Sequence, residues 1–94
     1  MRGLLEMRYR LAENVRARQE SWGLLFYSRV RHKVTFIRSG NWLRPEHFNG
    51  DWSTAEMIFE ISTRTGAPVE VIERYLPGLI ERLAAGRLIT DEVH

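Results

Sequence analysis

The chain has 94 residues with a hydrophobic content of 44%, and its fourteen Lys or Arg slightly outnumber its twelve Asp or Glu. This length and composition indicate one small folded domain and exclude a wholly disordered chain. Because there is no cysteine, disulfides, iron–sulfur ligation and a thiol nucleophile are excluded as well. No apolar run approaches the ~18 residues of a membrane span, and the first residues lack the apolar core of a signal peptide. We therefore expect a cytoplasmic protein without a membrane partner.

Charge is divided unevenly between the two halves of the chain. Residues 1–45 contain ten Lys or Arg and three Glu, a net charge of +7, whereas residues 46–94 contain four Arg and nine acidic residues, a net charge of −5. A basic half indicates an acidic partner, such as nucleic acid, lipid headgroups or an acidic peptide. An arginine-rich sheet face that is merely solvated is an equally good interpretation.

The first half of the chain has the pattern of β-strands. Small apolar and charged residues alternate over residues 15–19, which is typical of a half-exposed strand. Residues 23–28 (GLLFYS) form a denser apolar run, as in a central strand, and residues 33–37 (KVTFI) are rich in β-branched and aromatic side chains. The short connections predict an antiparallel meander. Residues 1–8, which precede it, are expected to be flexible.

The second half has the pattern of helices. A short helix is expected within residues 42–48. The next helix begins with a capping box, in which Ser53 is the cap and Glu56 is the third helical residue, and it ends at Gly66. The apolar face predicted for this helix consists of Ala55, Ile58, Ile61 and Thr65.

A last helix is predicted from Pro68 to Gly86, followed by an extended return over the core at residues 87–90. Pro77 lies inside this helix and cannot donate a backbone hydrogen bond, so a kink or break is expected near residues 75–78. The apolar stripe of the helix consists of Val69, Ile72, Leu76, Leu79 and Leu83.

Residues that carry chemistry are few and scattered. The histidines His32, His47 and His94 have no helical i, i+4 spacing and no cysteine to accompany them, so their pattern does not indicate a metal site. No nucleophile-elbow pattern frames a serine, and no glycine-rich loop is present to cradle a phosphate. The carboxylates of the predicted helices are interpreted as solvated faces and caps. An enzyme is therefore the least favoured class, and no catalytic residue, metal or cofactor is predicted.

A small sheet followed by helices is also typical of a winged helix, which makes DNA binding the alternative function. A recognition helix must face phosphates, and contacts with phosphates supply much of the affinity for DNA. The last predicted helix is slightly acidic instead, because it carries three glutamates and two arginines: Glu70, Glu73, Glu81, Arg74 and Arg82. Nucleic acid is therefore a disfavoured partner.

The strand at residues 33–37 has the pattern of an edge strand, because it begins with Lys33 and is followed by Arg38. Edge strands leave backbone N–H and C=O groups unpaired, and flanking charges commonly protect them against aggregation. The same ladder can accept an extended peptide as an added strand, or a second copy of the chain in an edge-to-edge homodimer. Composition alone leaves these alternatives open.

The order of the predicted elements resembles that of a known family. The segment YRLAENVRARQESWGLLFYSRVRHKVTFIRSG leads into VEVIERYLPGLIERLAAGRLI, and together they resemble the PqqD-like peptide chaperones, also called RiPP recognition elements. Within that group the chain is most similar to the stand-alone chaperones of radical SAM peptide-maturation systems, of the mycofactocin-chaperone type. The resemblance extends over residues 9–89 and rests on patterns, not on a catalytic signature.

The resemblance implies an α+β, winged-helix-like fold, in which a three-stranded antiparallel sheet is followed by three helices. It also implies a chaperone that binds the leader segment of a ribosomally made precursor peptide and presents it to a radical SAM maturase. In the family the leader lies between the third strand and the third helix. Carried over to this chain, the peptide-binding residues are Lys33, Val34, Thr35, Phe36, Ile37, Arg38, Tyr75 and Arg82. The chain departs from the family at residues 42–51, which form a poor first helix, and at Pro77.

Overall fold

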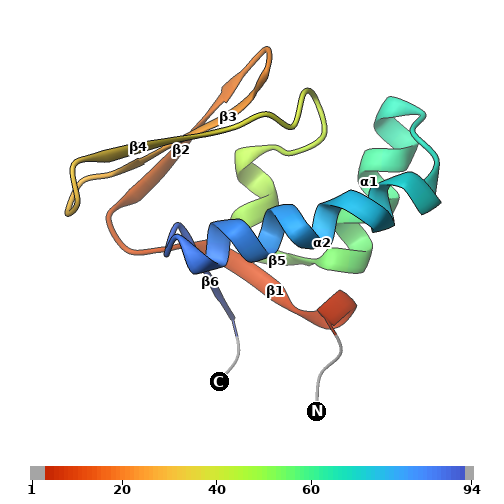
Figure 1. Cartoon of the computed structure of the whole chain (residues 1–94). Helices are drawn as coiled ribbons and strands as arrows, with labels where there is room; N and C mark the ends of the chain where they lie inside the picture. The colour runs from red at the N-terminus through yellow and green to blue at the C-terminus, as the bar shows by residue number, and fades with distance from the viewer. Residues whose placement is uncertain (1–3, 93–94) are drawn as a thin grey trace.

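The computed structural model of the protein describes residues 4–92 and has an α+β fold (Figure 1). In this described part, two three-stranded antiparallel sheets are combined with two α-helices and two short 3₁₀ helices. The expectation of one sheet and three helices is therefore wrong in its details. In chain order the elements are η1 (Leu4–Glu6), β1 (Arg8–Leu11), β2 (Val15–Glu20), β3 (Gly23–Ser28), β4 (Lys33–Ile37), η2 (Pro45–Phe48), β5 (Asn49–Ser53), α1 (Thr54–Thr65), α2 (Val69–Ala85) and β6 (Ile89–Asp91).

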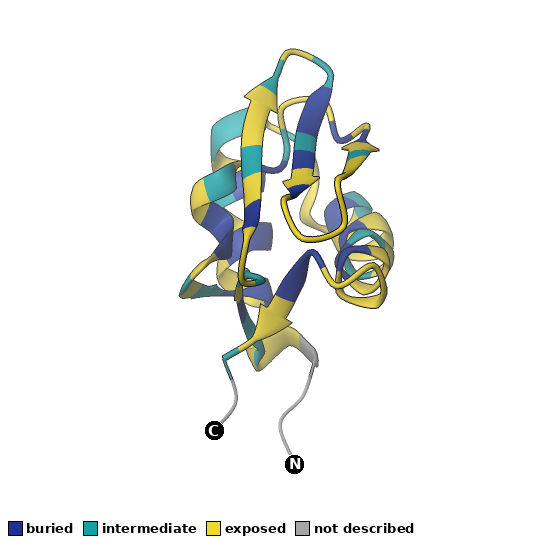
Figure 2. Ribbon diagram, turned by 90° about the vertical axis from the view of Figure 1, so that its left-hand side faces the viewer, coloured by how far each residue is buried: buried dark blue, intermediate teal, exposed yellow. Residues whose placement is uncertain are grey.

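The sheet β2-β3-β4 confirms the predicted meander, with β3 in the centre. From Leu24 to Ser28 of β3, buried residues alternate with less buried ones, as Figure 2 shows, because successive side chains of a strand point to opposite faces. Leu24 and Phe26 of β3 are fully buried on the inner face, together with Ile37 of β4. A Cβ atom at Gly23 would lie 1.9 Å from the carbonyl oxygen of Ile37, so only glycine allows the two strands to approach this closely.

The second sheet, in the order β5-β1-β6, was not predicted. Of residues 1–8, for which flexibility was expected, Leu4–Glu6 form η1 and Arg8 begins the central strand β1, whereas residues 1–3 lie outside the described part. Tyr9 of β1 is buried among core residues and pairs with Asp91 of β6. The strands pair residues that are far apart in sequence, such as Arg8 and Ser53, so no local pattern announces the sheet.

Helix α1 begins and ends as predicted. The hydroxyl of Ser53 accepts the N–H of Glu56 at 3.1 Å, and the Glu56 carboxylate accepts the N–H of Ser53 at 2.8 Å. Gly66 ends the helix with a left-handed φ of 80°. The predicted face is partly wrong, since Ala55 is exposed and Met57 is buried in its place. The buried residues of α1 are Thr54, Met57, Ile58 and Ile61.

Helix α2 runs through Pro77 as one continuous helix, so the break that was one of the two expected effects of this proline does not occur. Proline removes one backbone donor, but the buried stripe on both sides of it keeps the helix packed. This stripe consists of Ile72, Leu76, Ile80 and Leu83. Ile80 thus replaces the predicted Leu79, which is half-buried, and Val69 is exposed. The short helix expected within residues 42–48 is the 3₁₀ turn η2, and the extended return is β6, where Ile89 is buried.

One hydrophobic core joins both sheets to both helices. Its largest fully buried side chains include Phe26 of β3, Phe48 of η2 and Leu76 of α2. Phe26 and Phe48 meet edge to face, with ring centroids 6.2 Å apart. None of the helices in residues 4–92 is long and apolar enough to cross a membrane.

Candidate functional site

The outer edge of β4 carries no backbone pairing in the part of the chain that the structure describes, where β4 pairs with β3 alone. One backbone hydrogen bond establishes which residues of β3 direct their N–H and C=O groups toward β2 and which direct them toward β4. The N–H of Arg29 donates to the carbonyl oxygen of Asn14 at 2.9 Å, so these residues are a hydrogen-bonded pair that continues the β2–β3 ladder. Such pairs alternate along an antiparallel ladder. Tyr27 therefore directs its backbone groups toward β2, and Phe26 directs its own toward β4.

The same alternation continues into β4. Thr35 lies opposite Phe26, so the N–H and C=O groups of Thr35 face β3. The corresponding groups of Val34 and Phe36 face the open edge instead. The strand predicted to pair with a guest chain, at residues 33–38, thus presents the backbone N–H and C=O groups of every second residue at its open edge.

A hollow of about 580 Å³ lies where the end of β4 approaches one face of α2. Arg38, Ser39 and Trp42 line it from the connection that follows β4. Tyr75, Leu79 and Arg82 line it from α2, at the spacings of three and four that place residues on one helix face. A smaller hollow formed by Trp22, Phe36 and Arg38 adjoins the first one, because Arg38 lines both. We call the two hollows together the β4–α2 groove.

The structure brings half of the predicted site residues to this groove. Phe36, Arg38, Tyr75 and Arg82 line it, and Tyr75 and Phe36 are 57% and 62% exposed. The remaining four residues lie elsewhere on β4: Lys33 and Val34 are exposed, Thr35 is half-buried, and Ile37 belongs to the core. The side chain of Ile37 therefore supports the strand and is not presented to a ligand.

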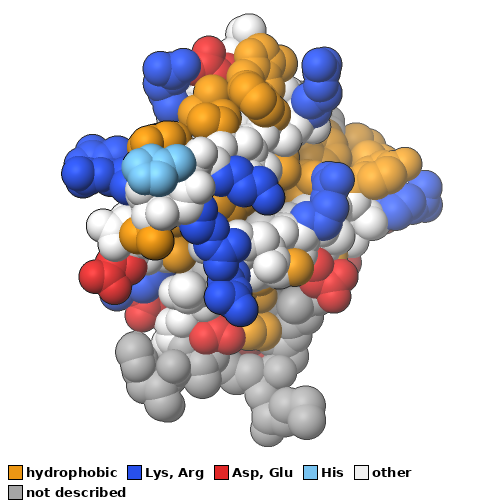
Figure 3. Space-filling model, turned by 60° about the vertical axis from the view of Figure 1, so that its left-hand side comes forward, with side chains coloured by type: hydrophobic (Ala, Val, Ile, Leu, Met, Phe, Trp, Pro, Cys, Tyr) orange, Lys and Arg blue, Asp and Glu red, His pale blue; other side chains and the backbone are white. Residues whose placement is uncertain are grey.

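The groove is basic around an apolar centre. Arg38, Arg74 and Arg82 line the larger hollow, and none of them forms an ion pair with a described residue. Among residues 4–92, no acidic side chain lines either hollow. Figure 3 shows basic side chains interspersed with hydrophobic ones over the upper part of the molecule, while most acidic side chains of that view lie lower. A ligand with carboxylates beside an apolar side chain would match this arrangement.

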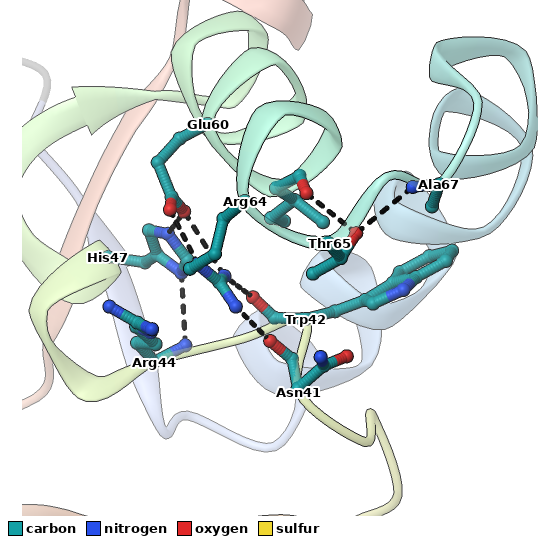
Figure 4. A network of polar contacts seen from close by, with 9 residues as sticks. Asn41, Trp42, Arg44, His47, Glu60, Arg64, Thr65 and Ala67 are labelled. Carbon is teal, nitrogen blue, oxygen red and sulfur yellow. Dashed lines mark hydrogen bonds and ion pairs between the residues drawn. The ribbon is translucent and has the colours of Figure 1, made fainter.

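A polar network fixes the connection between β4 and η2 against helix α1 (Figure 4). The guanidinium of Arg64 donates to the carbonyl oxygens of Asn41 and Trp42, the latter at 2.7 Å. It also pairs with the carboxylate of Glu60, with Nε and Oε2 2.6 Å apart. Because Trp42 lines the groove, this network holds one of its walls in place.

His47 of η2 completes the network through two hydrogen bonds. Its Nδ1 accepts the N–H of Arg44 at 3.0 Å, so Nε2 carries the proton and donates to Oε1 of Glu60 at 2.7 Å. Burial lowers the pKa of His47, and the hydrogen bond to Glu60 opposes this shift only in part. The hydrogen bond from Arg64 lowers the pKa of Glu60. Both ring nitrogens are engaged, so this histidine serves structure and has no nitrogen left to act as a base.

Sequence reasoning missed several of these residues. Glu60 was interpreted as part of a solvated helix face, yet it bridges His47 and Arg64. The i, i+4 spacing of Glu60 and Arg64 was the available signal for an ion pair. Trp42 and Leu79 reach the groove only through tertiary packing, and no local pattern marks them.

Within residues 4–92, no group of three or more His, Asp or Glu side chains is arranged to hold a metal ion. No protein-family model, no curated protein and no solved structure matches this chain. The functional assignment therefore depends on the geometry of the site and on the resemblance in sequence pattern.

Proposed function

We propose that this protein is a non-enzymatic, cytoplasmic peptide chaperone. It binds the leader segment of a ribosomally made precursor peptide as an added strand on β4 and presents it to a radical SAM maturase. The observation that carries the proposal is the unpaired ladder of β4 beside the β4–α2 groove. Backbone pairing would supply affinity and register, and alternate side chains of the guest would supply specificity.

The chemistry of the groove supports an acidic leader. A guest strand on β4 would direct every second side chain toward α2, where Tyr75 and Leu79 offer apolar surface. Its carboxylates would meet Arg38, Arg74 and Arg82, which are free of ion pairs to the described residues. Holding the peptide in this way raises its effective concentration at the maturase, which is the contribution that a chaperone makes to the reaction.

Gly78 supports a close approach of the guest to α2. It lies in the interior of the helix, where glycine costs about 1 kcal/mol relative to alanine. A Cβ atom at this position would meet no atom within 4 Å outside its own stretch of helix, so the packing of the fold does not require glycine. Gly78 lines the groove, and a residue without a side chain lets a guest backbone come near the helix surface.

A series of variants at Gly78 tests the proposal. The probe is the candidate precursor peptide, a short open reading frame to be sought among the neighbouring genes. In calorimetric titrations with it, we expect Gly78→Ala to weaken binding several-fold and Gly78→Leu to abolish it. Thermal unfolding should show that both variants are at least as stable as the parent, because alanine and leucine are better helix formers by up to about 1 kcal/mol. The matched control is Glu81→Ala, an exposed change on α2 outside the groove.

Two outcomes would contradict the proposal. Peptide affinity that is the same in the parent, Gly78→Ala and Gly78→Leu would exclude the groove as the binding site. Binding of duplex DNA in a gel shift, lost on charge reversal at Arg74 and Arg82, would favour the winged-helix alternative. An edge-to-edge homodimer would occupy the β4 ladder itself, so sedimentation without peptide must show a monomer.

A further inference from the structure

The outer face of the β2-β3-β4 sheet presents an organised surface that meets the peptide groove only at Phe36. The strand register places its side chains in two rows: Arg16, Tyr27 and Val34 in one, and Arg18, Leu25 and Phe36 in the other. Phe36, Val34 and Tyr27 are 62%, 43% and 37% exposed. Each row thus begins with an arginine on β2 and ends with an exposed apolar side chain on β4. We call these six residues the outer platform.

The fold does not account for this exposure. Val30, in the turn between β3 and β4, is 69% exposed and adds to the apolar surface at one end of the sheet. Trp22 packs against Phe36 at the other end, with ring centroids 5.5 Å apart. Contiguous exposed apolar surface of this kind marks a site of interaction, because leaving it in water is unfavourable.

The charges around the outer platform favour an acidic partner. Residues 15–38 contain six Lys or Arg and one acidic residue, Glu20, which pairs with Arg18. Arg16, Arg29 and Arg31 form no ion pair with described residues. Unpaired cations around an apolar centre favour a protein surface with carboxylates around an apolar patch. Two outer platforms placed face to face would bring these arginines against each other, which disfavours a symmetric dimer through this surface.

The outer platform is continuous with the peptide site. A strand added to β4 extends the sheet, so every second guest side chain would lie on the same face as Val34 and Phe36. The remaining guest side chains would face α2. A protein seated on the outer platform would therefore touch both the chaperone and half of the guest.

We propose that the outer platform is the docking surface for the enzyme that modifies the bound peptide. This inference rests on the proposed function, since it assumes that β4 carries the guest. The enzyme must contact this chain and the peptide together, and the outer face is where the two surfaces join. The groove would contact one set of guest side chains, and the enzyme would contact the alternate set. The enzyme should consequently bind more tightly when the peptide is present.

The test compares two charge-reversal variants of equal net charge. Arg16→Glu/Arg29→Glu alters the outer platform and its rim, whereas Arg10→Glu/Arg44→Glu alters exposed arginines outside this sheet. The enzyme used is a radical SAM maturase to be sought among the neighbouring genes. Its binding is measured by interferometry with and without the precursor peptide, and peptide binding is measured separately by calorimetry. We expect the first variant to weaken enzyme binding at least about tenfold and the control to change it little, with peptide affinity within about twofold in both.

The outcomes separate this inference from the proposed function. If the parent protein fails to bind the peptide, the proposed function is wrong. If the peptide binds but the outer-platform variant binds the enzyme as tightly as the control does, only the docking surface is wrong. The docking surface is also wrong if the enzyme does not bind the complex of the parent protein with the peptide. The same holds if the outer-platform variant changes only the oligomeric state of the chaperone.

Discussion

At the scale of single residues, the most informative group consists of buried His47, half-buried Glu60 and the guanidinium of Arg64. His47 is 1% exposed and neutral, with one nitrogen accepting a backbone N–H and the other donating to Glu60. Arg64 extends the pair to the carbonyl groups of the connection that carries Trp42. Three side chains thus connect η2, α1 and one wall of the groove. Protonation of the His47 imidazole should therefore affect the shape of the groove.

This pair predicts how stability depends on pH. The pKa of His47 lies below its usual value of 6.5 in the folded protein, so the unfolded chain binds more protons once the pH falls below about 6.5. The free energy of unfolding should be at its plateau above that pH and decrease as the pH falls toward the folded pKa. The lowered pKa of Glu60 acts in the same direction below its usual value of 4.5.

Urea unfolding at a series of pH values checks this expectation. The variant His47→Asn is the control, because it has no imidazole to protonate and should lose the part of the decrease that begins near pH 6.5. A parent protein whose stability stays level between pH 7 and pH 5 would contradict this role of His47.

At the scale of elements, the sequence predicted those parts whose signals are local. The meander follows from alternation and short connections, and the start of α1 follows from Ser53 and Glu56 three residues apart. The strands β1, β5 and β6 span three to five residues and pair across the length of the chain. Asn49 and Gly50 in β5 have the composition of a turn, so tertiary pairing overrides local preference there.

In the candidate site, too, the features with local signals were predicted and those that depend on tertiary packing were not. The cations at the ends of β4 marked it as an edge, and the structure shows that its outer side is unpaired among the described residues. The direction of each backbone group depends on the register with β3, which places Thr35 inward and Phe36 outward. Leu79 was assigned to the core stripe but lines the groove, because Ile80 takes the buried position.

Because β1 is the central strand of its sheet, substitution of its buried residue Tyr9 should strongly reduce the stability of the protein. Tyr9→Ala should reduce the free energy of unfolding by about 3 kcal/mol, as for other buried aromatic residues. Tyr9→Phe should cost less than about 1 kcal/mol, because the hydroxyl contacts only the weak acceptor Sδ of Met7, at 3.6 Å. Denaturant unfolding of both variants measures the difference. A loss below 1 kcal/mol in Tyr9→Ala would show that β1 contributes little to the fold.

At the scale of the whole molecule, the uneven charge of the chain becomes a spatial feature. The basic half supplies the sheet β2-β3-β4 and the connection after it, and the acidic half supplies both helices. The groove lies where these parts meet, yet its own lining is basic, because α2 turns Arg74 and Arg82 toward it. An acidic guest would therefore be attracted to the β4–α2 groove and not to the other faces of the helices.

Amide hydrogen exchange of β4, followed residue by residue with and without the precursor peptide, tests strand addition most directly. In the free protein the amides of Val34 and Phe36 should exchange fast and those of Thr35 and Ile37 slowly, because only the latter face β3. At saturation, exchange at Val34 and Phe36 should slow by at least about tenfold, as hydrogen bonds to the guest form. Saturable peptide binding that leaves these two amides in fast exchange would contradict the account.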